Sequence, residues 1–325
     1  MKDVIKKYLF KHPRLYQTCA YIYTILAHKE RLMRLESFGE KNRYETVMII
    51  RPNAEDGIQG LLSLVAETLR WIDYADQNKF IPVVDYKNFN TQYSNHVDNA
   101  WEFFFEQPTS LTLEEAYQSE RVLFSGVTKK PVIDLKLFSG EIFQNSSLLE
   151  ESKRIAQTWI HYTDEVNSVV DEENSQIHIE DCIGVYIRGT DYISLKPTGE
   201  YVQPSIGQVI KKIKEFSLKH GEKAIFLVTE DDIYYQAMKK EFGNRVKIVS
   251  YDSFIKNFHD KVYLSESNSL DKDLKNRGMK YLVKIVLLSR CRYLVSSIAK
   301  GSIMAYSLNE NGYEDEYIFN LGVYK

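Results

Sequence analysis

Three short polar segments combine residue types that bind phosphate and nucleobase groups, and each comes directly after a predicted buried strand. The first is YIRGTDY (residues 186–192), the second is FLVTEDD (226–232) and the third is VSSIAKGS (295–302). In parallel α/β sheets, ligands bind beyond the carboxyl ends of the strands. Three such segments in one half of the chain therefore predict a diphosphate site beside a base pocket.

The first segment supplies a cation, a glycine, a hydroxyl group and a carboxylate at the end of its strand. The guanidinium of Arg188 matches a phosphate in a bidentate geometry and keeps its charge at any relevant pH. Gly189 allows the backbone to approach a ligand closely. The same residues also fit a plain turn with an Arg188–Asp191 ion pair, so both interpretations stay open.

The second segment places acidic groups after Thr229. The carboxylate of Glu230 or Asp231 fits the N–H groups of a purine base. Acidic residues at this position are also ordinary caps and dipole partners of a helix N-terminus. Taken alone, the segment favours capping, and only its place beside the other two segments favours ligand binding.

The third segment runs from a strand through small hydroxylated residues into a helix. The hydroxyl groups of Ser296 and Ser297, together with backbone N–H groups at a helix N-terminus, are typical of an anion site. Lys300 adds a positive charge to it. We therefore include these three residues in the predicted donor site.

Common metal and cofactor motifs are absent from the sequence. It contains no C-x-x-C, H-E-x-x-H, G-x-x-x-x-G-K-[ST] or strand-linked G-x-G-x-x-G pattern. One D-x-D pair, Asp271 and Asp273, sits in a polar stretch typical of a solvated loop. We therefore expect no metal site and no resident cofactor.

The elements that must position these segments alternate between strands and helices, which predicts parallel sheets covered by helices. In the first half we expect strands at 45–51 and 80–85, helices at 61–75 and 147–170, and a structured loop over 86–107. In the second half we expect strands at 182–187, 224–228, 246–249, 293–296 and 318–321, with helices at 204–220, 231–242, 276–289 and 302–309. Two Rossmann-like halves follow from this pattern.

Composition places the chain among globular proteins. It has 325 residues, of which 44% are hydrophobic and 27% are charged, with a net charge of −3. This excludes a disordered chain, a coiled coil and a generally basic nucleic-acid binder, and the length suggests about two domains. Three scattered cysteines predict a reducing compartment, and hence a cytoplasmic location.

The first 35 residues differ from the rest in charge. They hold eight basic and two acidic residues, a net charge of +6, together with many aromatic and aliphatic residues. The pattern fits a helix lying on the inner face of an anionic cytoplasmic membrane. It also fits a pair of helices packed on the next domain with solvated lysines, which is the interpretation we favour. The apolar run 19–27 is too short to span a bilayer.

The motifs resemble the fucosyltransferase-like glycosyltransferases, which include the alpha-1,6-fucosyltransferases and the protein O-fucosyltransferases. The likeness is greatest to bacterial members from surface-polysaccharide gene sets and covers residues 45–325. It rests on the three segments above and on KPTGEYVQP (196–204), EDGIQGLL (55–62), VVDY (83–86) and NAWEFFFEQP (99–108). The resemblance implies a GT-B fold, with two facing Rossmann-like domains, the active site in the cleft, and inverting, metal-independent use of GDP-fucose.

The resemblance also implies roles for individual residues. It assigns Arg188 to the donor diphosphate, Glu230 with Asp231 to the guanine, Ser296 and Ser297 to phosphate oxygens, and Gly57 and Gln59 to the diphosphate from the first-domain side. The alpha-1,6 enzymes carry a His and a second Arg where this chain has Tyr186 and Gly189. That departure removes one positive charge from the motif.

Two carboxylates are candidates for the general base that activates an acceptor hydroxyl. Asp191 follows Arg188 closely and is expected to pair with it, which makes it a poor proton acceptor. Glu200 lies in a loop beside Gly199, and the alpha-1,6 enzymes carry an acidic residue in a comparable loop before a proline. A solvated loop glutamate is the alternative for Glu200.

We therefore expect a basic amphipathic helical head (1–40), an N-terminal Rossmann-like, acceptor-side domain (41–170) and a C-terminal nucleotide-sugar-binding domain (171–325). The expected activity is transfer of a sugar, fucose from GDP-fucose, to a glycan acceptor such as a lipid-linked surface-glycan or capsule precursor. The alternatives are a non-catalytic nucleotide- or glycan-binding protein on the same fold and a transferase that uses another nucleotide sugar.

Overall fold

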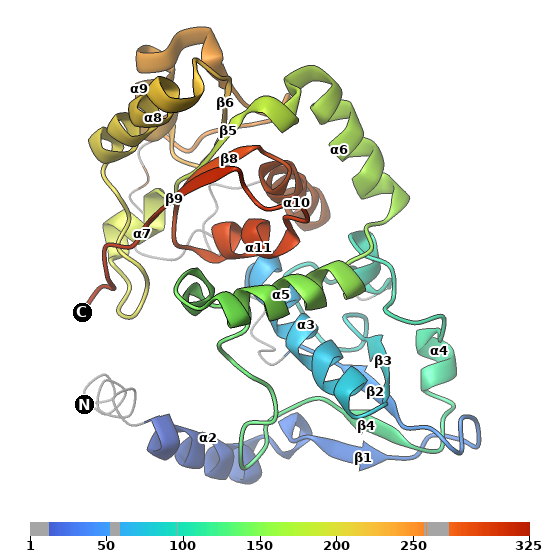
Figure 1. Cartoon of the computed structure of the whole chain (residues 1–325). Coiled ribbons are helices and arrows are strands. Elements are labelled where there is room, and N and C mark those ends of the chain that lie inside the picture. The colour runs from blue at the N-terminus through green and yellow to red at the C-terminus, as the bar shows by residue number, and fades with distance from the viewer. Residues whose placement is uncertain (1–12, 53–58, 96, 257, 259–272) are drawn as a thin grey trace. The chain divides into compact units, whose positions relative to one another are not determined.

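The computed structural model describes residues 13–52, 59–95, 97–256, 258 and 273–325 (Figure 1). Gly57 and Asp271 lie outside the described residues. The chain divides into two compact units. Unit 1 comprises Met1–Gly57, Glu67–Glu102 and Glu106–Leu135, and unit 2 comprises Ile58–Ala66, Phe103–Phe105 and Lys136–Lys325. Residues 136–170, which we expected in the N-terminal domain, therefore belong to unit 2.

Unit 1 contains a four-stranded sheet in the order β1-β4-β2-β3. Its strands are β1 (Arg34–Glu36), β2 (Val47–Ile50), β3 (Ile81–Val84) and β4 (Val122–Phe124), and β2 runs parallel to both of its neighbours. All four residues of β2 are buried, as is typical of a parallel strand covered on both faces. Its helices are α2 (Pro13–Ala27), η1 (Lys29–Arg31), most of α3 (Leu61–Gln77), most of η2 (Ala100–Phe103) and α4 (Leu113–Ala116).

Unit 2 contains a five-stranded, wholly parallel sheet in the order β7-β6-β5-β8-β9. The strands are β5 (Ile183–Tyr186), β6 (Ile225–Val228), β7 (Val246–Lys247), β8 (Tyr293–Ser297) and β9 (Asp315–Phe319). The expectation of parallel sheets combined with helices is confirmed. The core of unit 2 joins strand side chains such as Val185 and Leu227 to helix side chains such as Ile213 and Met238.

Capping side chains and glycines mark where helices of unit 2 begin and end. They are η3 (Gly140–Phe143), α5 (Ser146–Trp159), α6 (Asp164–Ile177), η4 (Ile179–Asp181), α7 (Thr190–Leu195), α8 (Ile206–His220), α9 (Asp232–Phe242), η5 (Gly243–Arg245), α10 (Leu274–Ser289) and α11 (Lys300–Leu308). Ser205 and Gln208 form a reciprocal capping box at the start of α8, and Gly221 ends it at φ +83°. Asp273, the described residue of the D-x-D pair, caps α10.

Two sequence expectations need correction. The single helix expected over 147–170 is two helices, α5 and α6, because Thr163 adopts extended backbone and its side chain caps α6 by accepting the Val166 N–H. Tyr162, beside it, forms a bridge with Phe105 instead of continuing α5. The head is also not wholly helical, because β1 pairs antiparallel with β4 and extends the first sheet.

Candidate functional site

The three polar segments meet at one edge of the sheet in unit 2. Strand β5 lies between β6 and β8, and the register places Tyr186 opposite both Val228 and Ser296. Because all three strands run in the same direction, the residues that follow them emerge together at their carboxyl ends. Arg188, Glu230 and Ser297 are therefore brought to the same edge, as the sequence predicted.

Arg188 is held between two carboxylates at this edge. Its Nη2 donates to Asp191 Oδ2 at 3.0 Å, and its Nε lies 3.6 Å from Glu230 Oε1. Burial alone would lower the pKa of Arg188, but Glu230 and then Asp191 outweigh it and hold the pKa well above its usual value. The guanidinium also lies over the Tyr192 ring at 5.2 Å. A permanent cation is thus fixed in place.

Gly189 interlocks the first two segments through its backbone. Its N–H donates to Glu230 Oε1 at 2.9 Å, and the Thr190 N–H donates to Asp231 Oδ2 at 3.1 Å. A β-carbon at Gly189 would lie 2.5 Å from both Cβ and Oδ2 of Asp231, so only glycine fits without movement. Asp231 also caps α9 by accepting the Ile233 N–H at 2.8 Å, as the capping interpretation predicted.

Asp191 is wholly committed to neighbouring groups. It is 1% exposed and accepts hydrogen bonds from Arg188, from the Thr190 hydroxyl at 3.2 Å and from the Tyr192 N–H at 3.1 Å. Thr190, which begins α7, has φ +41°, a left-handed value that a β-branched residue rarely adopts. The arrangement suits an anchor for Arg188 better than a proton acceptor.

Glu200 is half-buried and lies within a loop that the C-terminal segment holds. The Tyr192 hydroxyl donates to Glu200 Oε2 at 3.1 Å, and burial, followed by Glu200, raises the pKa of Tyr192, so the phenol keeps its proton. Two backbone hydrogen bonds of 2.9 Å join Gly199 N–H to Tyr324 O and Tyr324 N–H to Glu200 O. Backbone hydrogen bonds therefore hold this loop against the C-terminal segment.

The third segment ends at the N-terminus of α11. Ser297 is fully buried, and its hydroxyl has no hydrogen-bond partner among the described residues. Ser296 donates to the Ser297 carbonyl at 2.8 Å, and Lys300 donates to the Phe138 carbonyl at 2.9 Å. A β-carbon at Gly301 would lie 2.5 Å from the Tyr186 ring. The N-terminal end of α11 therefore lies very close to β5.

The predicted residues fall into three groups. One group shares the strand edge or its adjoining loops: Arg188, Gly189, Asp191, Glu200, Thr229, Glu230, Asp231, Ser296, Ser297 and Lys300. Within it, Thr229 is buried and its hydroxyl accepts the Asp231 N–H at 3.2 Å. Gln59 is half-buried in the Ile58–Ala66 part of unit 2, and Gly57 lies outside the described residues.

Two polar side chains at this edge were missed by sequence reasoning. The Tyr281 hydroxyl on α10 lies 3.2 Å from the Tyr186 hydroxyl, and burial raises the pKa of both. Gln203 donates to the Ile298 carbonyl at 3.3 Å and so joins the Glu200 loop to the third segment. Tyr281 gives no local signal, whereas Gln203 lies inside the segment 196–204 that carried the family resemblance.

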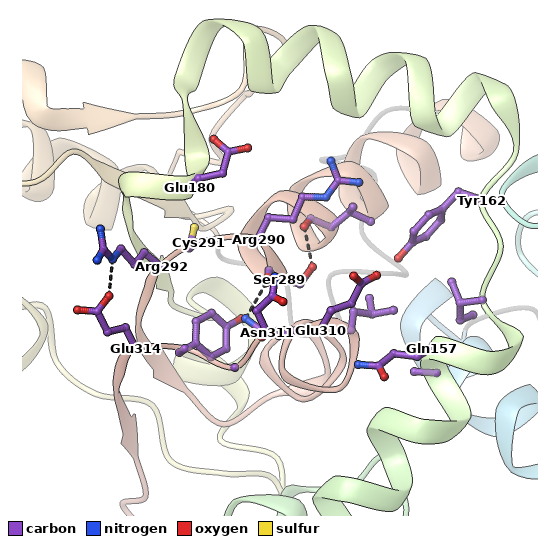
Figure 2. Close-up of a pocket in the computed structure, with 17 residues that line it drawn as sticks. Gln157, Tyr162, Glu180, Ser289, Arg290, Cys291, Arg292, Glu310, Asn311 and Glu314 are labelled. Atoms are coloured by element: carbon purple, nitrogen blue, oxygen red, sulfur yellow. Dashed lines mark hydrogen bonds and ion pairs between the residues drawn. The ribbon is translucent and has the colours of Figure 1, made fainter.

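A separate cavity of about 790 Å³ opens at the other end of the same sheet (Figure 2). Its lining includes Arg290, Cys291 and Arg292, which directly precede β8, and Glu314, which precedes β9. Figure 2 shows Arg292 paired with Glu314 across its wall. None of the residues predicted to bind a ligand lines this cavity, so it offers a comparison site for mutagenesis.

Comparison with known proteins identifies the fold. No protein-family model and no curated protein matches the chain. Among solved structures, fucosyltransferase NodZ from Bradyrhizobium aligns with a TM-score of 0.50 and 15% identity over 85% of this chain and 96% of that one. NodZ alpha-1,6-fucosyltransferase co-crystallised with GDP aligns with a TM-score of 0.49 and 14% identity over 80% of this chain and 92% of that one. POFUT1 in complex with GDP-fucose aligns with a TM-score of 0.48 and 9% identity over 86% of this chain and 99% of that one. The chain therefore has a fucosyltransferase-like fold.

Proposed function

We propose that this chain is a GT-B glycosyltransferase that transfers fucose from GDP-fucose, with inversion and without a metal ion, to a surface-glycan or capsule precursor in the cytoplasm. The observation that carries the proposal is the position of Arg188, a partly buried and permanently charged guanidinium at the carboxyl edge of a parallel sheet. The fold shared with fucosyltransferase NodZ supports the same reaction class.

The proposed chemistry needs stabilisation of a leaving diphosphate. Negative charge grows on that group as the bond to the sugar breaks, and fixed cations and N–H dipoles stabilise it without reorganising. Arg188 supplies the cation, and the N-terminus of α11 supplies a positive dipole end beside the buried Ser297 hydroxyl. In this proposal Arg188 gives up its contact with Glu230 and contacts the donor diphosphate when the donor binds.

Acceptor activation needs a carboxylate that has capacity to take a proton. Asp191 accepts hydrogen bonds from Arg188, Thr190 and Tyr192. We therefore assign it a structural role, that of holding Arg188 in place. Glu200 accepts a side-chain hydrogen bond from Tyr192 and is partly exposed. We therefore propose Glu200 as the general base, positioned by Tyr192 and by the strap of residues 322–324.

Nucleotide binding by two arginine variants tests the proposal. We expect Arg188→Ala to weaken GDP binding about ten- to a hundredfold, which is the affinity that one charge-assisted hydrogen bond contributes. Isothermal titration calorimetry measures this affinity. Arg290→Ala, in the cavity of Figure 2, is the matched control and should bind GDP like the wild type. Equal GDP affinity of Arg188→Ala and wild type, or a loss confined to Arg290→Ala, would show that the donor site is misplaced.

Donor identity and turnover need their own measurements. A thermal-shift screen of GDP-, UDP- and dTDP-sugars identifies the donor, because a ligand that binds the native state raises its stability. We expect GDP-fucose to give the largest shift. Release of free fucose from GDP-fucose, even when slow, separates a transferase from a non-catalytic binding protein on the same fold, which would bind the nucleotide and release nothing.

A further inference from the structure

Three aliphatic side chains of helix α2 lie on its outer face, while Ile25 is half-buried. Leu15, Ile22 and Leu26 are 45%, 50% and 79% exposed, whereas Thr24 is 6% exposed. At 3.6 residues per turn the three apolar side chains fall within about 40° of one another around the helix axis, and Thr24 points the opposite way. This orientation is the reverse of an ordinary surface helix, which turns its apolar stripe toward the core.

This orientation argues against the simpler interpretation of the basic head. If α2 were a helix packed on the neighbouring domain, its apolar stripe would be buried there. Instead, among the described helices and strands, the main contacts of α2 are with η1, which follows it directly in the chain. Single exposed apolar side chains are common, but three in one stripe mark a surface that contacts something else.

The charge around α2 indicates the chemistry of the partner. Residues 1–35 carry a net charge of +6 in a chain whose overall charge is −3. Leu32 forms a bridge with Val127, and three exposed lysines lie within three residues of it: Lys29, Lys129 and Lys130. Cations that follow an outward apolar stripe, near the C-terminal end of its helix, are complementary to an anionic lipid surface.

We propose that α2 binds the surface of an anionic lipid bilayer, with Leu15, Ile22 and Leu26 entering the interface and the nearby lysines contacting the headgroups. The helix has 15 residues, which suits a position in the plane of the surface. In the part of the chain that the structure describes, no helix has the length and apolar character needed to cross a membrane. This inference stands independently of the proposed sugar transfer.

Vesicle binding of the full chain tests the proposal. We expect it to co-sediment with phosphatidylglycerol-containing vesicles at low salt and not with pure phosphatidylcholine vesicles. Leu26→Asn with Ile22→Asn should weaken binding roughly tenfold or more, and Lys129→Glu should weaken it roughly fivefold. The matched controls are Leu218→Asn, which changes an even more exposed leucine on α8, and Lys240→Glu on α9, and both should bind like the wild type.

A probe on Cys19 checks that the stripe itself enters the lipid. Cys19 is exposed and lies beside Ile22 on the outward face of α2, whereas Cys182 and Cys291 are buried, so an environment-sensitive fluorophore attaches to one site. We expect a blue shift with anionic vesicles, and none for the same dye on Cys19→Ser/Leu218→Cys. No vesicle binding by the wild type, equal binding by the asparagine variants, or a concentration-dependent dimer lost in those variants without any lipid effect would overturn the proposal.

Discussion

Gly189 and Asp231 are in such close contact that neither segment that holds them can move alone. The β-carbon of any other residue at 189 would lie 2.5 Å from Asp231, and Asp231 in turn caps α9. The carboxyl ends of β5 and β6 are therefore joined directly, through a contact that depends on a missing side chain.

Replacing Gly189 with alanine should displace Asp231 and destabilise the chain. We expect a loss of about 1–3 kcal/mol in the free energy of unfolding, the usual cost of overpacking, measured by urea denaturation. Gly207→Ala is the matched control, because a β-carbon there has no neighbour within 4 Å, and the change in helix α8 should stabilise by about 0.5–1 kcal/mol. Equal stability of the two variants would contradict the close contact.

Glu200→Gln should lower turnover about 10²- to 10⁴-fold while leaving GDP affinity unchanged, because it removes only the proposed base. Asp191→Asn should instead weaken donor binding, since Asp191 anchors Arg188. Initial rates with an acceptor and separate GDP titrations distinguish the two variants. Full turnover by Glu200→Gln would exclude it as the base, and a loss of rate alone in Asp191→Asn would transfer the role to Asp191.

GDP affinity and turnover should be the same with EDTA as with added magnesium or manganese. The physical reason is that Arg188 and the α11 N-terminus supply the positive charge that a metal ion would otherwise bring to the diphosphate. Chelator titrations of both quantities check it. Activity that EDTA abolishes and manganese restores would contradict the prediction and direct attention to Asp271 and Asp273.

Thiol labelling of the native protein at pH 8 should modify Cys19 alone. Burial, followed by Asp181 and Glu180, raises the pKa of Cys182 to about 12, and burial raises that of Cys291 well above its usual value. The thiolate is the reactive form, so both stay unreactive until the pH is strongly alkaline or the chain unfolds. Mass spectrometry should find one label in the native state and three in urea; two or more native labels would contradict the burial of this pair.

Asp315 should make the fold sensitive to acid. Burial alone would raise the pKa of Asp315, but hydrogen bonds from Lys219 at 2.8 Å and from His220 at 2.7 Å outweigh it and lower the pKa. A lowered carboxyl pKa contributes stability at neutral pH that is lost as the pH falls through the folded-state pKa. Asp315→Asn should therefore be less stable than wild type at pH 7, with the difference closing below about pH 4, whereas Glu310→Gln should not differ.

The sequence predicts which residues lie at the strand edge better than it predicts how the strands and loops pack together. The position of Arg188, Glu230 and Ser297 at one edge is predictable because each follows a buried apolar run, and parallel strands deliver such residues to one edge whatever their order. The order itself has no local signal: nothing near Tyr186 in the sequence indicates that β8, rather than β7, lies beside β5. The same holds for the contacts between Tyr192 and Glu200 and between Glu200 and Tyr324, which depend on how distant segments fold back.

Three local features of the fold differ from the sequence prediction or were not predicted, and each has a physical reason. The break between α5 and α6 was overlooked because apolar spacing continues through it, although Thr163-Asp164-Glu165 is a recognisable helix start. Strand β1 has three residues and no alternating pattern long enough to detect, so its pairing with β4 appears only in the structure. The orientation of α2 was left open, because periodicity shows that a helix has an apolar face but not which way that face points.

The fastening of the Glu200 loop by residues 322–324 has a consequence for the order of biosynthesis. On the ribosome, β5, β6 and the Arg188 segment are made long before β8, β9 and the segment that follows them. The Glu200 loop therefore stays unfastened until residue 324 has emerged. A nascent chain stalled after α11 would hold the proposed diphosphate-binding residues without a positioned base. The polypeptide therefore acquires the elements that bind a donor before the contacts that position the base.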